Sequence, residues 1–350
     1  MFAYWALFSY FMVGSLSERS SNRGHRISSF FLLVGAIVVA LLIGLRFQVG
    51  GDWSQYEQLF AYARFSNARQ MLEFGDPAYQ LLNLVVADNG GDLWLVNLIS
   101  GAIFTWGLFR LAKTQPDPWL VMLAAIPYLV VVVAMGYTRQ AVAIGILMAG
   151  LASLFRGGSV FKYALYVAAA ATFHKTAVVG LPLVIFVSGR SRLLNALFVL
   201  ASGILFYDLF LSSATDDLFK NYVDAKYNSQ GAAIRVAMSA IPASLFLLMR
   251  KRFAMNPREY IVWRNFAFAS FALVVLLLVL PSSTVVDRLA LYILPIQLAI
   301  ISRFPQLGFG SAFGRILAIG YSFAVLFVWL NFAVYASKWI PYQLYPVFGS

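Results

Sequence analysis

The sequence contains no cysteine and only two histidines, His25 and His174. The absence of cysteine excludes disulfide bonds, thiolate metal sites, iron–sulfur clusters and a cysteine nucleophile. A catalytic zinc site built on two or three imidazoles is likewise excluded. Nothing in the sequence supports a magnesium ion held by carboxylates. We therefore expect neither a metal nor a cofactor.

Charged residues are scarce as well, at 11% of the 350 residues, whereas 61% are hydrophobic. A soluble domain carries roughly 25% charged residues, so this much apolar surface predicts an integral membrane protein. At ~20 residues per spanning helix, the chain accommodates about a dozen crossings and no sizeable soluble domain. We expect one transmembrane domain over residues 1–350, of all-α class.

Runs without charge predict about twelve spans, some of them shorter than the ~17 residues that a full crossing requires. The spans are expected at 2–16, 27–45, 93–109, 119–138, 140–155, 163–173, 176–189, 193–207, 236–249, 265–286, 289–302 and 316–337. Because the pair 163–173 and 176–189 is the shortest, we interpret it as a broken or re-entrant element.

The loops between these spans alternate in charge, and this alternation predicts the orientation. One set of loops holds sixteen basic residues, at Arg19, Arg23, Arg26, Arg110, Lys113, Arg156, Lys162, Arg190, Arg192, Arg250, Lys251, Arg252, Arg258, Arg264, Arg303 and Arg315. The acids of that set are only Glu18, Asp117 and Glu259. The positive-inside rule makes these loops cytoplasmic and both termini outward. The net charge of +12 then reflects topology and attraction to membrane lipid, and we expect no nucleic acid partner.

Two outward segments, 46–92 and 208–235, are long enough to do more than connect spans. Within the first, Trp53, Tyr56, Leu59, Phe60 and Ala63 recur at helical spacing among polar residues. This pattern predicts an amphipathic helix in the membrane interface. The second segment carries tyrosines among charged residues, which is compatible with a sugar-binding loop but more typical of a solvated one.

Ionisable residues at outward helix ends are the candidates for function, since their burial must be compensated by a partner or a ligand. Arg46 ends the second span and precedes Gly50, Gly51, Asp52 and Trp53. The paired glycines allow a tight turn, and Asp52 can cap the amphipathic helix. The plainer interpretation of these residues is a helix cap followed by an interfacial tryptophan.

A second candidate is Arg139, between Tyr137 and Gln140 in a minimal outward turn. Free backbone N–H groups at the start of the next helix can bind an anion together with its guanidinium. The alternative is an arginine that reaches for lipid headgroups.

His174 and Lys175 form a third candidate, at the break between the two shortest spans, and Asp287 with Arg288 a fourth. Irregular backbone at membrane depth is tolerated mainly where it lines a cavity. A lone histidine is nevertheless more often structural than catalytic, and the adjacent opposite charges of the fourth candidate can simply balance other charges.

If these four places converge, they suit a phosphate-bearing lipid. Guanidinium groups bind phosphate bidentately and stay charged, and a neutral imidazole can take a proton from a hydroxyl group. The linear sequence does not show the convergence.

At these residues the chain resembles the EpsG family, a group of Wzy-type polysaccharide polymerases of bacterial cell surfaces. The resemblance covers roughly residues 40–345 and rests on the order and outward placement of short motifs. These motifs are Arg46…Gly51-Asp52-Trp53…Tyr56…Phe60, then Gly136-Tyr137-Thr138-Arg139-Gln140-Ala141, Phe173-His174-Lys175-Thr176-Ala177 with Leu181-Pro182-Leu183, Arg288, and Trp339-Ile340-Pro341-Tyr342.

The resemblance implies a bundle similar to that of the GT-C membrane glycosyltransferases. It also implies polymerisation of undecaprenyl-pyrophosphate-linked oligosaccharides into exopolysaccharide, capsule or O-antigen, at the outer face of the plasma membrane. Arg139 and Arg288, with Arg46 as a third, would hold the pyrophosphate, and His174 would be the base, with Asp52 as its rival. Supporting residues would be Trp53, Tyr56, Tyr137, Gln140, Lys175 and Tyr342. A Wzx-type flippase and a chain-length regulator would be functional partners.

Three other classes compete with this interpretation. A flippase or transporter of lipid-linked sugars would need outward arginines too, but would show internal repeats and polar residues across the midplane. A membrane acyltransferase with a histidine base predicts a cytoplasmic donor site. An O-antigen ligase performs closely related chemistry and differs in its acceptor.

Overall fold

The fold is helical throughout the part of the chain that the computed structural model describes, which is residues 1–17, 22–187, 197, 200, 201, 204, 229, 231–280, 282–308 and 310–348. The α-helices are α1 (Phe2–Ser17), α2 (Asn22–Gly44), α3 (Trp53–Ala63), α4 (Ala68–Leu72), α5 (Pro77–Asp88), α6 (Leu93–Ala112), α7 (Pro118–Ala125), α8 (Thr138–Phe155), α9 (Val160–Phe173), α12 (Ala232–Leu248), α13 (Pro257–Val279), α14 (Ser283–Ile293), α15 (Pro295–Ile301), α16 (Ser311–Phe332) and α17 (Tyr345–Phe348). A π-helix, η1 (Ile126–Ala134), continues α7, and short 3-10 turns include η2 (Lys175–Gly180), η3 (Pro182–Val184) and η8 (Ala336–Lys338).

The lengths and apolar compositions of these helices are those of a polytopic membrane protein. Four helices, α6, α8, α13 and α16, are long and apolar enough to span a membrane. A fifth candidate is the pair Ser283–Ile293 and Pro295–Gln306, bent by 42°. Shorter apolar helices are Phe2–Ser17, Ser28–Gly44, Pro118–Ala134, Val160–Phe173, Lys175–Val184 and Ala232–Leu248. The expected span 193–207 and most of the expected loop 208–235 lie outside the described residues, so the number twelve stays a prediction.

Two expected boundaries differ in the structure. The span expected over 265–286 ends at Val279, and Asp287 and Arg288 belong to the start of α14 instead of the end of the preceding helix. Leu280 is extended, as expected for the residue before a proline, and Pro281 is next in the sequence. In place of a regular helix over 176–189, the structure has η2 and η3, which agrees with the predicted broken element.

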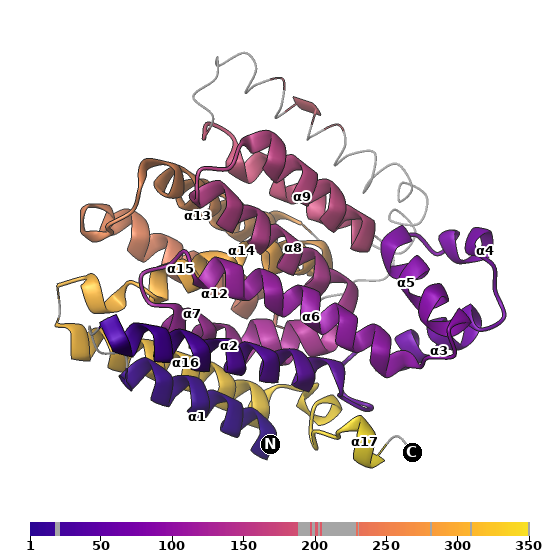
Figure 1. Ribbon diagram of the computed structural model, residues 1–350. Coiled ribbons are helices and arrows are strands. Elements are labelled where there is room, and N and C mark those ends of the chain that lie inside the picture. The colour runs from indigo at the N-terminus through magenta and orange to yellow at the C-terminus, as the bar shows by residue number, and fades with distance from the viewer. Residues whose placement is uncertain are drawn as a thin grey trace.

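The segment 46–92 forms three helices at one end of the bundle, together with the N-terminus and α17 (Figure 1). We call this the α3–α5 end. The expected amphipathic helix is α3, and its apolar side chains Tyr56 and Phe60 pack against Tyr79 of α5 and Val96 of α6. The apolar face is therefore covered by protein, and its location in the membrane interface stays a prediction.

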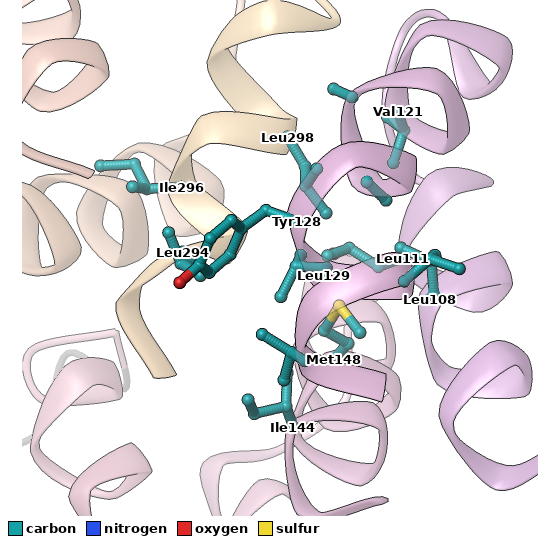
Figure 2. Close-up of a cluster of buried hydrophobic side chains, with 14 of the residues drawn as sticks. Leu108, Leu111, Val121, Tyr128, Leu129, Ile144, Met148, Leu294, Ile296 and Leu298 are labelled. Carbon is teal, nitrogen blue, oxygen red and sulfur yellow. The ribbon is translucent and has the colours of Figure 1, made fainter. Parts of the chain in front are cut away.

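The centre of the bundle is the continuous helix of α7 and η1, whose side chains are almost all buried. Figure 2 shows Leu129 of η1 beside Leu111 of α6 and Met148 of α8, with Leu294 and Leu298 on the other side. The run from 118 to 134 is apolar on every side, which is the pattern of a helix enclosed by other helices.

Glycines bring α6 and α8 into close contact. A Cβ atom on Gly107 would lie 1.8 Å from the carbonyl oxygen of Gly145, and one on Gly145 would lie 2.5 Å from the Cα of Phe104. Small residues allow this approach of helix backbones within a membrane, where there is little hydrophobic driving force between helices.

Two ion pairs, one buried and one part-buried, join helices at the end of the bundle opposite to α3–α5. Arg303 contacts Glu259 at 2.6 Å, and Arg315 contacts Asp117 at 2.7 Å. Arg303 also donates to Gln115 Oε1 at 2.6 Å. These pairs link the α6–α7 connection, α13 and the ends of α15 and α16.

We expect Gly107→Ala to destabilise the protein, because its methyl group overlaps the α8 backbone, and overpacking typically costs about 1–3 kcal/mol. Gly320→Ala is the matched control, since no atom lies within 4 Å of a Cβ atom at that position and alanine favours helix by about 1 kcal/mol over glycine. Thermal unfolding in detergent should show a lower Tm for the first variant and an equal or higher Tm for the second. Equal Tm changes for both would contradict the close contact.

Candidate functional site

The carboxylate of Asp76 joins its own turn to the start of α8 and to the break between α9 and η2. Oδ2 accepts a hydrogen bond from Arg139 Nη1 at 2.9 Å and lies 3.4 Å from His174 Nδ1. Oδ1 accepts from the backbone N–H of Lys175 at 3.2 Å. Two of the predicted site residues are therefore held together by an acid that sequence analysis did not select.

The local sequence explains how Asp76 reaches these partners. It lies between Gly75 and Pro77 and directly precedes α5, with a left-handed φ of 49° that aspartate tolerates better than most residues. Its side chain makes no capping bond to α5. The carboxylate points away from its own helix toward α8 and the α9–η2 break.

The environment of Asp76 favours its ionised form. Burial alone would raise the pKa of Asp76, but the hydrogen bond and charge of His174, the Arg139 guanidinium and the Lys175 N–H together lower it below its ordinary value. Because an ionised carboxylate only accepts hydrogen bonds, the proton between the two side chains belongs to His174 Nδ1. A neutral His174 then carries its lone pair on Nε2.

Arg139 lies in the first turn of α8, as predicted, and packs on Tyr56 of α3. Its guanidinium carbon is 5.9 Å from the Tyr56 ring centroid, and its backbone N–H donates to the Tyr56 hydroxyl at 3.4 Å. The Arg139 side chain remains 23% exposed although it pairs with Asp76. The Arg139 guanidinium can thus contact a ligand while Asp76 and Tyr56 fix its orientation.

The environment of a second carboxylate, that of Asp52, disfavours its ionised form. Burial raises the pKa of Asp52, and the positive charges of Arg288, Arg139, Lys338 and His174 oppose this effect without cancelling it. Asp52 stands at the N-cap position of α3 but makes no capping bond, so the expectation that it caps this helix is wrong. Three of these charges, on Arg288, Arg139 and His174, belong to predicted site residues, and Lys338 is a further one.

Arg288 is exposed on α14 beside this group. Gln140 Nε2 donates to the Arg288 carbonyl oxygen at 2.7 Å and so ties α8 to α14. One turn further along α14, the hydroxyls of Tyr292 and Thr176 lie 2.7 Å apart. These two contacts fix the distance from α14 to the Arg139 and His174 segments.

The turn that carries Asp52 packs directly on the turn that precedes Arg139. Gly50 has φ of +116°, and a Cβ atom there would lie 2.1 Å from the carbonyl oxygen of Met135. A Cβ atom on Gly136 would lie 2.5 Å from the ring of Trp339. Glycine at position 50 lets the two backbones meet, and glycine at position 136 leaves room for the buried Trp339 ring.

Arg46, a predicted pyrophosphate ligand, is only 1% exposed. Its guanidinium donates to the carbonyl oxygens of Ile43 and Val49, to Asn97 Oδ1 at 2.9 Å and to Thr138 Oγ1 at 2.7 Å. The expectation of an open anion contact therefore does not fit this geometry. Arg46 instead joins the end of α2 to the starts of α6 and α8 next to the site.

The predicted supporting residues fall into two groups. Tyr56, Tyr137 and Gln140 lie within the site. Tyr342 donates to the Leu42 carbonyl oxygen at 2.8 Å, while Trp53 packs against Phe47 with ring centroids 5.8 Å apart. Lys175 takes part through its backbone N–H. Tyr342 and Trp53 thus support the surrounding segments.

A cavity of about 700 Å³ opens beside Asp52. Its polar lining includes Asp52, Tyr137, Arg235 and Lys338, and its apolar lining comes from α12 and α16. Among the described residues, no group of three or more His, Cys, Asp or Glu side chains is placed to hold a metal.

Arg235 is the second residue that sequence analysis missed. We assigned it to the end of the 208–235 loop, but α12 begins at Ala232 and Arg235 is buried in its first turn. It pairs with Asp287 and donates to the Tyr128 hydroxyl at 2.9 Å. The only signal was a charge just before an apolar run.

Comparison with known proteins gives a family but no individual relative. The EpsG family model matches residues 3–344. No curated protein matches the chain, and no solved structure does.

The opposite pKa shifts of the two carboxylates predict opposite effects on stability. Asp76 has a lowered pKa, so its contribution is present above the pKa of the unfolded chain and is lost as the pH falls through the folded value. For Asp52 the pKa is raised, so its ionised form costs stability, and this cost develops as the pH rises through the unfolded and folded pKa values. At pH 7 we expect Asp76→Asn to lower the Tm and Asp52→Asn to raise it. A lower Tm for both variants would show that Asp52 is also held by favourable charges.

Arg46→Lys should destabilise the protein strongly, because a lysine cannot reach all four acceptors and each unsatisfied buried group costs about 1–3 kcal/mol. Arg288→Lys is the control, since Arg288 is exposed. Thermal unfolding should separate them by many degrees. If Arg46→Lys unfolds like the unsubstituted chain, the anchoring role is wrong.

Proposed function

Because the chain belongs to the EpsG family, we propose that it polymerises undecaprenyl-pyrophosphate-linked oligosaccharide repeat units at the outer face of the bacterial plasma membrane. The product would be exopolysaccharide, capsule or O-antigen. Family membership makes the chain a polysaccharide polymerase-like membrane protein. The substrate, the face of the membrane and a mechanism without metal belong to the proposal.

The observation that carries the proposal is the group of charges around Asp52. Arg139, Arg288, His174 and Lys338 all act on its carboxylate, and they come from segments far apart in the sequence. Asp52 and Lys338 line the cavity, and Arg139 and His174 meet at Asp76. Such a group suits a substrate with a pyrophosphate and a reacting hydroxyl.

The proposed reaction is a direct displacement at the anomeric carbon of the donor. An acceptor hydroxyl oxygen forms the new glycosidic bond while the bond from the anomeric carbon to the phosphate oxygen breaks. The hydroxyl proton passes to a base on the protein, and undecaprenyl pyrophosphate leaves with the bonding electrons. One displacement of this kind inverts the anomeric configuration.

Arg139 and Arg288 would stabilise the leaving pyrophosphate, where negative charge develops. Arg139 is suited to this task because Asp76 and Tyr56 hold it from one side. Arg46, with its guanidinium buried, would support the site without touching the pyrophosphate.

His174 is the proposed base. Asp76 accepts a hydrogen bond from the His174 Nδ1–H group, which leaves Nε2 free to take the proton of the acceptor hydroxyl. An aspartate orients a general base in this way. Asp52 is the rival, because it lies on the cavity and its raised pKa favours a role in proton transfer.

A flippase and an O-antigen ligase are the alternatives that the experiment must separate. A flippase would move the same lipid without breaking a glycosidic bond, and a ligase would use a different acceptor. In the proposed pathway, a Wzx-type flippase would supply the substrate and a chain-length regulator would limit the product.

We expect deletion of the gene to leave single lipid-linked repeat units and no long polymer, and restoration of the unsubstituted gene to return the polymer. Arg139→Ala and Arg288→Ala should fail to restore it although the protein stays in the membrane, and Arg139→Lys should be poor because lysine cannot bind bidentately. His174→Ala should lose at least about 100-fold in turnover, the usual contribution of a general base. Size separation of the extracted glycans gives the measurement.

Ile316→Ala provides a control, since Ile316 is exposed on α16 outside the cavity lining and should restore normal polymer. If the deletion strain keeps its lipid-linked units on the cytoplasmic face of the membrane, the protein is a flippase and not a polymerase. Long polymer that is no longer joined to its final acceptor would indicate a ligase. Full activity of His174→Ala together with inactive Asp52→Asn would transfer the role of base to Asp52.

A further inference from the structure

The cavity beside Asp52 continues as an apolar groove between α12 and α16. We call it the α12–α16 groove, and its wall is formed by Ile234, Met238, Tyr321, Ala324, Val328 and Phe332. On each helix these positions recur at intervals of three, four or seven, so each helix contributes one face. The floor is Tyr128 of η1.

The groove is open at its side. Ile234 is 62% exposed, Val328 50% and Phe332 71%, although all three are large apolar residues. Since α16 is long and apolar enough to span a membrane, we expect Val328 and Phe332 on its exposed face to meet the hydrocarbon region. A lipid chain can therefore enter the groove laterally, without passing through water.

The length of the groove corresponds to one leaflet. From Tyr321 to Phe332 a helix rises about 16 Å at ~1.5 Å per residue, roughly half of the ~30 Å hydrocarbon core. Phe332 is the last residue of α16, and η8 with Lys338 follows it toward Asp52. The groove thus runs from the bundle interior to the α3–α5 end.

The end of the groove at Asp52 is polar and charged. Lys338 is exposed there, and Arg235 lines the cavity while Asp287 and Tyr128 hold it in place. The positive charges of Arg288 and Arg139, the arginines of the proposed reaction, also act on Asp52. One cavity therefore has an apolar channel at one end and cations at the other, which matches a lipid with a phosphate headgroup.

We infer that the α12–α16 groove binds the prenyl chain of the donor substrate, with the donor pyrophosphate at the Lys338 end. This inference rests on the proposed function. It commits to the donor because the bond that breaks joins the anomeric carbon to the donor's own lipid phosphate. The lipid of the acceptor lies a whole repeat unit away from the reacting hydroxyl. Only the donor therefore places lipid phosphate and reacting carbon side by side at Asp52.

The shape of the groove distinguishes this occupant from others. The groove is lined by one face of α12 and one face of α16, which suits the single prenyl chain of the donor, whereas a glycerophospholipid carries two chains. A second copy of this chain would have to bury the charged end around Asp52 and Lys338, and burial of charges without partners is costly.

The test is photochemical cross-linking in reconstituted vesicles of phosphatidylethanolamine and phosphatidylglycerol that contain undecaprenyl pyrophosphate. A benzophenone amino acid replaces Val328 in the groove or, as the matched control, the neighbouring Phe327, which is 43% exposed and does not line the cavity. We expect undecaprenyl pyrophosphate on the α16 peptide of the Val328 variant and its loss in the Phe327 variant, as measured by mass spectrometry. Equal labelling at both positions, phospholipid alone at position 328, or a cross-linked dimer would each overturn the inference.

A second substitution tests the same groove by filling it while the photoprobe stays at Val328. Ala324→Trp, combined with the Val328 probe, should fill the groove and require at least about tenfold more undecaprenyl pyrophosphate for half-maximal labelling, a difference of about 1.4 kcal/mol. Ile316→Trp places the same indole side chain on α16 outside the groove and should change nothing. Unaltered labelling in Ala324→Trp would overturn the inference.

The glycan profile of the host keeps this test separate from the proposed function. Normal polymer without groove labelling would refute the groove and leave the polymerase intact. Specific labelling at position 328 in vesicles, together with host glycans that gene deletion leaves unchanged, would support the groove and refute the polymerase.

Discussion

The α3–α5 end of the molecule depends on one buried charge, that of Arg46. An arginine cannot be neutralised by losing a proton, so a guanidinium that is 1% exposed must find acceptors within the protein. It finds them in Val49, Asn97 and Thr138, and its backbone bridges Leu344. The end of α2, the start of α6, the start of α8 and the C-terminal segment are thereby held around one point. The position of the Asp52 turn follows from this arrangement.

Two carboxylates next to this anchor have opposite properties. Asp76 is held by Arg139, His174 and a backbone N–H, and its pKa is lowered, whereas Asp52 makes no capping bond and its pKa is raised. Enzymes that perform acid–base chemistry at neutral pH commonly separate the pKa values of neighbouring groups in this way. One carboxylate is thus suited to orient other groups and the other to exchange a proton.

The sequence predicted those features that depend on local pattern. The apolar spacing from Trp53 to Ala63 matches α3 residue by residue, and Arg139 begins a helix as expected. The role of Asp76 was not predictable, because its partners lie 63 and 98 residues away and Gly75-Asp76-Pro77 reads as an ordinary turn. For Arg46, the sequence reveals a charge at a helix end but not that the C-terminal segment covers it. The α12–α16 groove is a gap between two helices far apart in the chain, which no local pattern encodes.

The ion pairs of Arg303 with Glu259 and of Arg315 with Asp117 have a mechanical consequence. They fasten α13 and α16 at the end opposite to the site, and stability within a protein is distributed unevenly along such contacts. At its other end α16 is followed by the buried Trp339, whose Nε1 donates to the Val131 carbonyl oxygen at 2.7 Å. Both ends of α16 are therefore fastened to the bundle. A prenyl chain in the proposed groove would then enter and leave sideways, between α12 and α16, and would not require either end of α16 to come away from the bundle.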